Sequence, residues 1–197
     1  MNNGFSQLKM YFKSKVSFTE KELELIDEYF EVRWFRKKDF LLESGKICDF
    51  IGYIDKGIIR HFHIKEGVEN TCDISFEEYW VTDLQSFVTN NHSVMNLQAL
   101  EDTTVFVISK KNLPALYEMC CKYETFGRLV TEEVAQRATD IAMSLSADKP
   151  EERFIKLMKN QPALFQRVPQ KHIANLLGIK PESLSRIRKR ILNKSKY

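Results

Sequence analysis

The stretch that decides the fold of this chain is Val168-Pro-Gln-Lys-His-Ile-Ala-Asn-Leu-Leu-Gly-Ile-Lys-Pro-Glu-Ser-Leu-Ser-Arg-Ile-Arg-Lys-Arg-Ile191. Its apolar residues recur at helical spacing and predict one helix near Pro169 to Leu177 and a second helix that starts at Pro181. Gly178 lies between the two and permits the left-handed backbone that a tight corner between helices requires. The stretch therefore predicts a helix-turn-helix.

The second helix of this pair has two chemically distinct faces. Leu184, Ile187 and Ile191 fall on one face at a period of 3.6 residues, and polar side chains fall on the other. An Arg on the polar face can donate two hydrogen bonds to guanine, and a Glu can accept one from cytosine. We therefore predict that this helix reads the major groove of double-stranded DNA. The predicted DNA-binding residues are Gln170, Lys171, Glu182, Ser183, Ser185, Arg186, Arg188, Lys189 and Lys194, with Arg190 and Lys196 as further phosphate ligands.

The charge of the chain is distributed unevenly. Residues 150–197 carry 12 Lys and Arg against 3 Asp and Glu, whereas residues 1–149 carry 18 against 24. A small basic module beside an acidic remainder indicates that the module meets a polyanion. A solvated helix that merely happens to be basic is the alternative.

The first two thirds of the chain predict a β-rich domain followed by a long helix. Helical patterns over residues 5–30 include a capping box at Thr19 and Glu22, and short apolar runs separated by turns follow from Glu31 to Ser109. We expect an α+β chain with an antiparallel β-roll of the cupin-like jelly-roll type over residues 1–111. A dimerisation helix follows in residues 112–147, and a winged-helix-like helix-turn-helix domain occupies residues 148–197.

An apolar stripe runs along the predicted long helix from Glu124 to Leu145. Its members recur at spacings of three and four: Val130, Val134, Ala138, Ile141 and Leu145. The stripe is interpreted as the seam of a homodimer, and packing on the β-roll of the same chain is the alternative. Beyond it, Ser146 to Pro150 predicts a hinge in which Asp148 caps the next helix.

The order of these parts resembles the Crp/Fnr superfamily of transcription regulators over nearly the whole chain. The Glu182-Ser-Leu-Ser-Arg186 segment is similar to the E-x-x-S-R signature of the Fnr-type branch. The resemblance implies a homodimer in which Glu182, Ser185 and Arg186 read a palindrome of TGA-type half-sites, with RNA polymerase as a further candidate partner. Family members often carry a β-hairpin wing, which we expect near Phe165 to Val168.

The effector of the β-roll is unknown or absent. In cyclic-nucleotide-binding members a Gly-Glu pair and a later Arg-Ser pair hold ribose and phosphate; the residues that align here are Thr82, Asp83, Ser93 and Val94. Because the Arg is replaced, a phosphate loses a charge-assisted partner worth about 1.5–3 kcal/mol, and we expect no control by cAMP. No cysteine cluster precedes Cys48, so an iron-sulfur cofactor is not expected.

Two other classes of protein compete with this interpretation. His61, His63 and Glu66 on a β-roll are compatible with a cupin-like metal-dependent enzyme, although their spacing is short for that motif. The other class is a dimeric scaffold without DNA binding, and an effector-independent dimeric regulator is a variant of the main hypothesis. We expect no catalytic residues, no metal and no cofactor. The chain shows no apolar run long enough to span a membrane and no signal peptide, so we expect a cytoplasmic protein.

Overall fold

The computed structural model describes residues 5–194 of the 197-residue chain, with side chains as far as residue 191. These residues divide into two compact units, one containing 5–69 and 73–134 and the other 70–72 and 135–194. None of the helices within 5–194 combines the length and the apolar character that crossing a membrane requires. The two units are described separately.

The first unit begins with three short helices, α1 (Ser6–Lys15), α2 (Glu20–Leu23) and α3 (Leu25–Tyr29). The predicted capping box at the start of α2 is confirmed. The backbone N–H of Thr19 donates to Oε2 of Glu22 at 2.7 Å, and the N–H of Glu22 donates to Oγ1 of Thr19 at 3.3 Å. These bonds satisfy two amide groups that the end of a helix would otherwise leave without partners.

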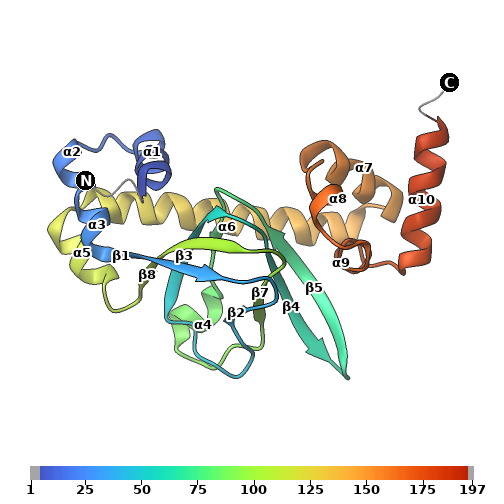
Figure 1. Ribbon diagram of the computed structural model, residues 1–197, viewed down its shortest axis with the longest axis horizontal. Coiled ribbons are helices and arrows are strands. Elements are labelled where there is room, and N and C mark those ends of the chain that lie inside the picture. Colours follow the sequence, from blue (N-terminus) through green and yellow to red (C-terminus); the bar gives the residue numbers. More distant parts are fainter. Residues whose placement is uncertain (1–4, 195–197) are drawn as a thin grey trace. The chain divides into compact units, whose positions relative to one another are not determined.

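The predicted antiparallel β-roll is confirmed and consists of two four-stranded sheets (Figure 1). The strand order is β1-β8-β3-β6 in the first sheet and β2-β7-β4-β5 in the second. A short helix, α4 (Leu84–Thr89), separates β6 from β7. The strands are β1 (Phe30–Phe35), β2 (Phe40–Leu42), β3 (Phe50–Lys56), β4 (Ile59–Lys65), β5 (Val68–Ser75), β6 (Trp80–Val81), β7 (Asn96–Ala99) and β8 (Thr103–Ser109).

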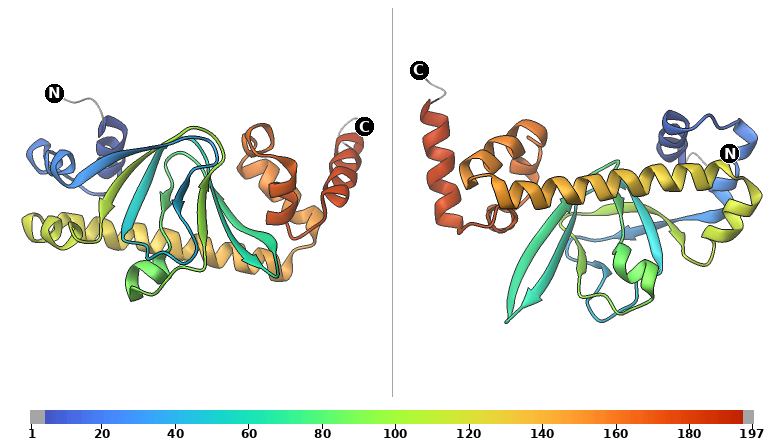
Figure 2. Two further views of the ribbon diagram at one scale, coloured as in Figure 1. Left: turned by 60° about the horizontal axis from the view of Figure 1, so that its bottom comes forward. Right: turned by 180° about the vertical axis from the view of Figure 1, so that it is seen from behind.

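The first sheet is covered on both faces because its side chains alternate between two cores. Phe50, Ile54 and Val107 point into the roll and pack with residues of the second sheet. Tyr53 and Phe106 point outward and pack under the helices that cover this face. Figure 2 shows, from two sides, how α1 and the first half of the long helix α6 lie against the roll. The sheet is therefore hydrophobic on both sides.

The predicted long helix is also confirmed. α5 (Leu113–Met119) leads into α6 (Lys122–Ala147), whose bounds contain the predicted segment. The start of α6 is joined to α2, because Nζ of Lys122 donates to Oε2 of Glu22 at 2.8 Å and the Tyr123 hydroxyl donates to the Glu22 carbonyl oxygen at 2.7 Å. The amino-terminal helices and α6 thus form one layer.

The second unit contains the helices α7 (Pro150–Asn160), α8 (Leu164–Arg167), α9 (Gln170–Leu176) and α10 (Pro181–Lys194). The expectation that Asp148 caps α7 was wrong: Lys149 is the N-cap residue, and the Asp148 carboxylate accepts from Nζ of Lys156 at 2.7 Å. A wing was expected near Phe165 to Val168, but residues 165–167 belong to α8 and Val168 is its C-cap residue. Residues 148–194 contain no strand, so the described part of this domain is entirely helical.

Candidate nucleic-acid interface

The corner between α9 and α10 has the geometry that the sequence predicts. Gly178 has a φ of +67°, a backbone conformation that residues with a side chain rarely adopt. Its N–H donates to the Asn175 carbonyl oxygen at 2.9 Å, and the N–H of Ile179 donates to that of Ala174 at 2.9 Å. Ile173 and Ala174 are fully buried, so a small residue at 174 allows α10 to approach closely. The predicted helix-turn-helix is present.

The two faces of α10 lie as the periodicity predicts. Leu184 and Ile187 are buried against the rest of the unit. The opposite face is exposed over Glu182, Ser185 and Arg186, and continues to Lys189. Nε of Arg186 lies 3.4 Å from the carbonyl oxygen of Glu182, so this weak contact uses one of the five N–H donors of the guanidinium. This face presents both donors and acceptors to solvent.

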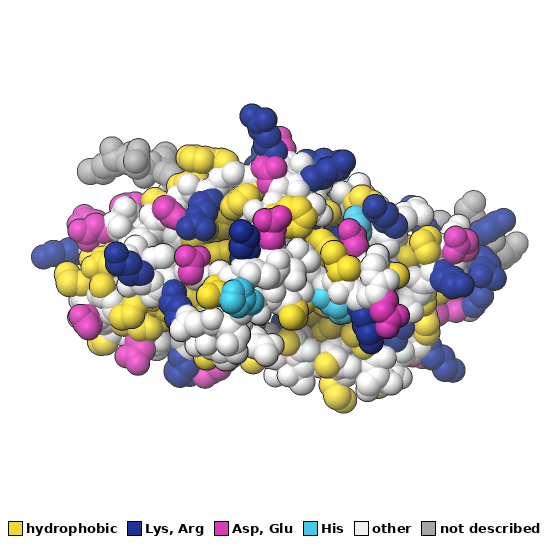
Figure 3. All heavy atoms as spheres, turned by 90° about the horizontal axis from the view of Figure 1, so that it is seen from below, with side chains coloured by type: hydrophobic (Ala, Val, Ile, Leu, Met, Phe, Trp, Pro, Cys, Tyr) yellow, Lys and Arg dark blue, Asp and Glu magenta, His cyan; other side chains and the backbone are white. Residues whose placement is uncertain are grey.

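The remaining predicted DNA-binding residues are not all equivalent. Gln170, Lys171 and Arg188 are exposed, whereas Ser183 is half-buried. Arg190, one of the predicted phosphate ligands, pairs with Oε2 of Glu151 at 2.7 Å. The side chain of Lys194 and the whole of Lys196 lie outside the described residues. Figure 3 shows Lys and Arg side chains gathered at the end of the view that carries α10.

A partly buried set of hydrogen bonds that the sequence did not reveal supports the corner. The Arg153 guanidinium, on α7, donates through Nη2 to the Leu177 carbonyl oxygen at 2.7 Å and through Nη1 to that of Asp148 at 2.8 Å. Two longer contacts, 3.2 Å from Nε to the same Leu177 oxygen and 3.3 Å from Nη1 to the Leu145 oxygen, complete the set. All of its acceptors are backbone atoms, and no side-chain pattern in the sequence reports them.

Three of the four residues aligned with the cyclic-nucleotide site, Thr82, Asp83 and Ser93, are occupied by contacts within the protein. Asp83 caps α4 by accepting from the N–H of Ser86 at 3.3 Å, and the Ser93 hydroxyl donates to its other oxygen at 2.5 Å. The Thr82 hydroxyl donates to the Phe50 carbonyl oxygen at 2.8 Å. Ser93 is only 4% exposed, whereas Val94 points outward. The structure thus brings the acid and the serine together and leaves Val94 apart.

The apolar stripe of α6 divides between two environments. Val130 is buried in the core of the first unit and Val134 packs against it, as in the alternative interpretation of the stripe. Ile141 is half-buried, while Ala138 and Leu145 are exposed. A neighbouring row of exposed residues recurs at strictly alternating spacings of four and three, which is the pattern of a coiled-coil seam: Thr131, Ala135, Ala138, Ala142 and Leu145. That alternation in the sequence was the signal that could have identified the row.

The residues of the cupin hypothesis have other neighbours. Nε2 of His61 lies 3.0 Å from Oγ of Ser75, and Glu66 is exposed in the turn between β4 and β5, with a φ of +54°. Among residues 5–194, no group of three or more His, Cys, Asp or Glu side chains has the arrangement of a metal site. The geometry therefore gives the metal-enzyme hypothesis no support.

Comparisons with known proteins agree with this architecture. Residues 32–120 match the cyclic nucleotide-binding domain family. The fold is similar to FixK2 from Bradyrhizobium japonicum (13% identity, TM-score 0.69, covering 84% of this chain and 86% of that one). It is also similar to CLP, a c-di-GMP responsive global regulator of Xanthomonas campestris (15% identity, TM-score 0.68, covering 90% of this chain and 93% of that one). A CooA mutant from Carboxydothermus hydrogenoformans is 16% identical with a TM-score of 0.67, and the match covers 92% of this chain and 83% of that one.

A search of curated protein sequences gave no match to this chain. The family match covers the β-roll, and the solved structures extend the likeness through the long helix to the carboxyl-terminal helices. The chain therefore contains a cyclic-nucleotide-binding-type β-roll over residues 32–120 and has a fold similar to those of FixK2, CooA and CLP.

Proposed function

We propose that this protein is a sequence-specific DNA-binding transcription regulator of the Crp/Fnr type. The observation that carries the proposal is the exposed face of α10, where Glu182, Ser185 and Arg186 follow a glycine corner of helix-turn-helix geometry. On this proposal Glu182 and Arg186 contact base edges, while Lys171, Arg188 and Lys189 contact phosphates. Such a protein acts in the cytoplasm, and RNA polymerase is the partner through which it would change transcription.

The proposed active form is a homodimer joined along α6. The exposed row from Thr131 to Leu145 contains three alanines at coiled-coil spacing, so two copies of the helix can approach closely. A two-fold dimer would present two α10 helices to half-sites about 34 Å apart, one turn of DNA. Among the predicted seam residues, Ala138 and Leu145 belong to this row.

Control by cAMP is not part of the proposal. The Asp83 carboxylate is already bonded to Ser93 and to the backbone of α4, and Ser93 stands where a cation would meet the phosphate. A nucleotide phosphate placed there would lose a charge-assisted bond and would also have to disrupt that hydrogen bond.

The experiment that tests the proposal is selection of bound duplexes from a randomised DNA pool, followed by sequencing. We expect enrichment of a palindrome with half-sites about one helical turn apart. Enrichment of no sequence, with the protein folded, would contradict the proposed function. The dimer is tested by Ala138→Arg, which we expect to yield monomers in sedimentation velocity, against the control Gln136→Arg on another face of α6.

A further inference from the structure

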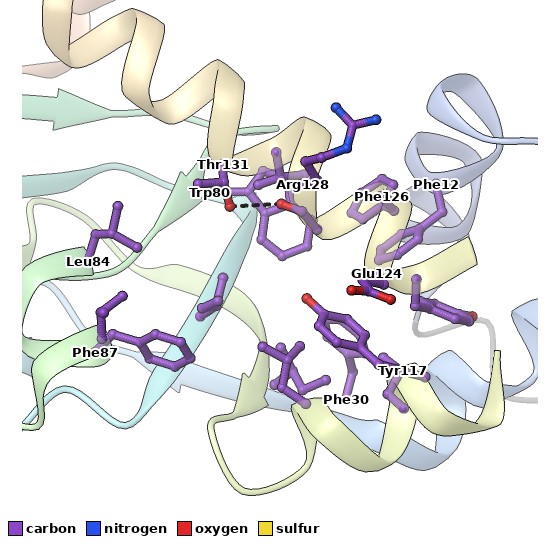
Figure 4. Close-up of a pocket in the computed structure, with 18 residues that line it drawn as sticks. Phe12, Phe30, Trp80, Leu84, Phe87, Tyr117, Glu124, Phe126, Arg128 and Thr131 are labelled. Atoms are coloured by element: carbon purple, nitrogen blue, oxygen red, sulfur yellow. Dashed lines mark hydrogen bonds between the residues drawn. The ribbon is translucent and has the colours of Figure 1, made fainter. Parts of the chain in front are cut away.

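The first unit contains a cavity of about 330 Å³ that no part of the proposed DNA-binding function uses. It lies on the outer face of the first sheet, bounded by side chains from α1, α4, α5 and α6 (Figure 4). Its size is within the range of sites that bind small molecules. The residues aligned with the cyclic-nucleotide site do not line it.

The walls of the cavity are aromatic and fixed by their own packing. The rings of Phe12 and Phe126 stack with centroids 3.7 Å apart, and Trp80 packs on Phe126 at 5.8 Å. Phe87, from α4, forms part of the opposite wall, beside the partly exposed Leu84. Because these side chains support one another, a ligand would enter a preformed apolar site.

Two polar groups lie at one end of the cavity. The hydroxyl of Tyr117 and the carboxylate of Glu124 appear near one another in Figure 4, and within residues 5–194 neither makes a hydrogen bond or ion pair. Gly127 makes room for the tyrosine, because a Cβ at that position would clash with the hydroxyl oxygen. Burial and the charge of Glu124 both raise the pKa of Tyr117, which stays protonated as a donor.

The cation one helical turn after Glu124 does not neutralise this end. The guanidinium of Arg128 points away from the cavity, and its Nη1 pairs with Oε1 of Glu132 at 2.5 Å. The polar end therefore presents a negative charge and a hydroxyl group beside aromatic faces. That combination favours a ligand head group that is cationic and donates hydrogen bonds, and it disfavours an anionic one.

We propose that this cavity binds a small molecule with an aromatic or aliphatic body and a protonated amine, with the body against Phe12, Phe87 and Phe126 and the amine at Glu124. The site is separate from the nucleotide position at Asp83 and Ser93. Val88 also lines the cavity and is 64% exposed.

The cavity also borders the proposed dimer seam. Glu124, Arg128 and Thr131 line it and continue the four-three row of Ala135 and Ala138 toward the amino terminus of α6. A ligand at Glu124 therefore changes the charge of the row along which a second helix would lie. This regulatory step rests on the proposed function, whereas binding of the amine does not.

Binding is tested by calorimetry on the full chain without DNA, using 4-phenylbutylamine and its acid counterpart, 4-phenylbutyrate. We expect the amine to bind at least about tenfold more tightly, and Glu124→Gln to remove most of that preference. Tighter binding of the acid, or a preference that Glu124→Gln leaves unchanged, would overturn the proposal.

Two matched substitutions locate the site. Val88→Trp should fill the cavity and abolish amine binding, whereas Val94→Trp, at a similarly exposed valine beside Ser93, should leave it intact. Unchanged melting temperatures would show that both variants fold. The opposite result would place the ligand at the nucleotide position and contradict the assignment.

The regulatory step has a separate readout. Saturating amine should change the affinity for the selected duplex in the wild type and not in Val88→Trp. If the amine binds but the affinity for DNA is unchanged, the coupling to the seam is wrong. If the protein binds no DNA at all, the proposed function fails and the calorimetric result still stands.

Discussion

Two sets of polar side chains in this protein are similar in chemistry and opposite in surroundings. Asp83 and Ser93 in the β-roll are joined by a 2.5 Å hydrogen bond, and the carboxylate also caps α4. Glu182, Ser185 and Arg186 on α10 combine an acid, a hydroxyl and a cation on an exposed face. The first set is bonded within the fold, and the second leaves its hydrogen-bonding groups exposed to solvent. The presence of an acid and a serine does not by itself mark a ligand site.

The largest expected effect is on DNA recognition. Arg186→Ala should weaken binding of the cognate duplex by about 1–3 kcal/mol and relax the preference at one base pair, with little loss of stability because the side chain is exposed. Titrations of cognate and scrambled duplexes measure the effect. Arg190→Ala is the control, since that guanidinium is paired with Glu151. An equal loss on both duplexes would make Arg186 a phosphate ligand.

The second prediction reverses the pattern for the β-roll. Asp83→Ala removes the carboxylate acceptor of the buried Ser93 hydroxyl, which keeps only a 3.1 Å bond to the Met95 carbonyl oxygen, and leaves the Ser86 N–H without its cap, so the free energy of unfolding should fall by about 1–3 kcal/mol. Denaturant titration measures the loss. The affinity for DNA, measured well below the melting temperature, should be unchanged. Asp83→Asn keeps an acceptor and should therefore lose less free energy of unfolding. A stable Asp83→Ala protein with weakened DNA binding would refute the contrast between the two sets.

A smaller effect is expected for a phosphate contact. Lys171→Ala, at the exposed start of α9, should weaken binding of the cognate and scrambled duplexes by the same factor. It should also lower the slope of log binding constant against log salt concentration by about one. Fluorescence anisotropy at several salt concentrations gives the slope. Lys156→Ala provides the control, because Lys156 pairs with Asp148. A sequence-dependent loss at Lys171 would mean that α9 also reads bases.

The smallest expected effect is that of cAMP. A ligand at 100 times its Kd would stabilise the protein by about 2.7 kcal/mol, whereas we expect no rise in melting temperature because Ser93 already holds Asp83. Differential scanning fluorimetry with millimolar cAMP is sufficient. A clear rise that Asp83→Asn abolishes would show that the nucleotide can displace the serine.

The helix-turn-helix was predictable because its determinants are local. A glycine of positive φ and apolar residues at helical spacing lie within about two dozen residues. The strands of the roll were predictable as a class, but their partners were not: β1 pairs with β8, and the cavity joins Phe12 to Thr131. A local periodicity in the sequence cannot predict which distant segments come together to form the walls of the cavity.

The stripe on α6 shows a different limit of sequence analysis. The predicted row and the exposed four-three row share Ala138 and Leu145, so an apolar period near 3.6 could not separate them. Only burial distinguishes Val130, which belongs to the core, from Thr131, which is exposed. Arg153 was invisible for another reason, because its acceptors are carbonyl oxygens.

The contacts of Arg153 change the meaning of the segment from Ser146 to Pro150, which in the sequence looks like a flexible hinge. One guanidinium donates to the carbonyl oxygens of Leu145, Asp148 and Leu177, so bending there would break several charge-assisted bonds at once. A rotation of the end of α6 should therefore be transmitted to the corner before α10 and not be absorbed by bending within residues 146–150. Helix α10 would then turn together with the end of α6.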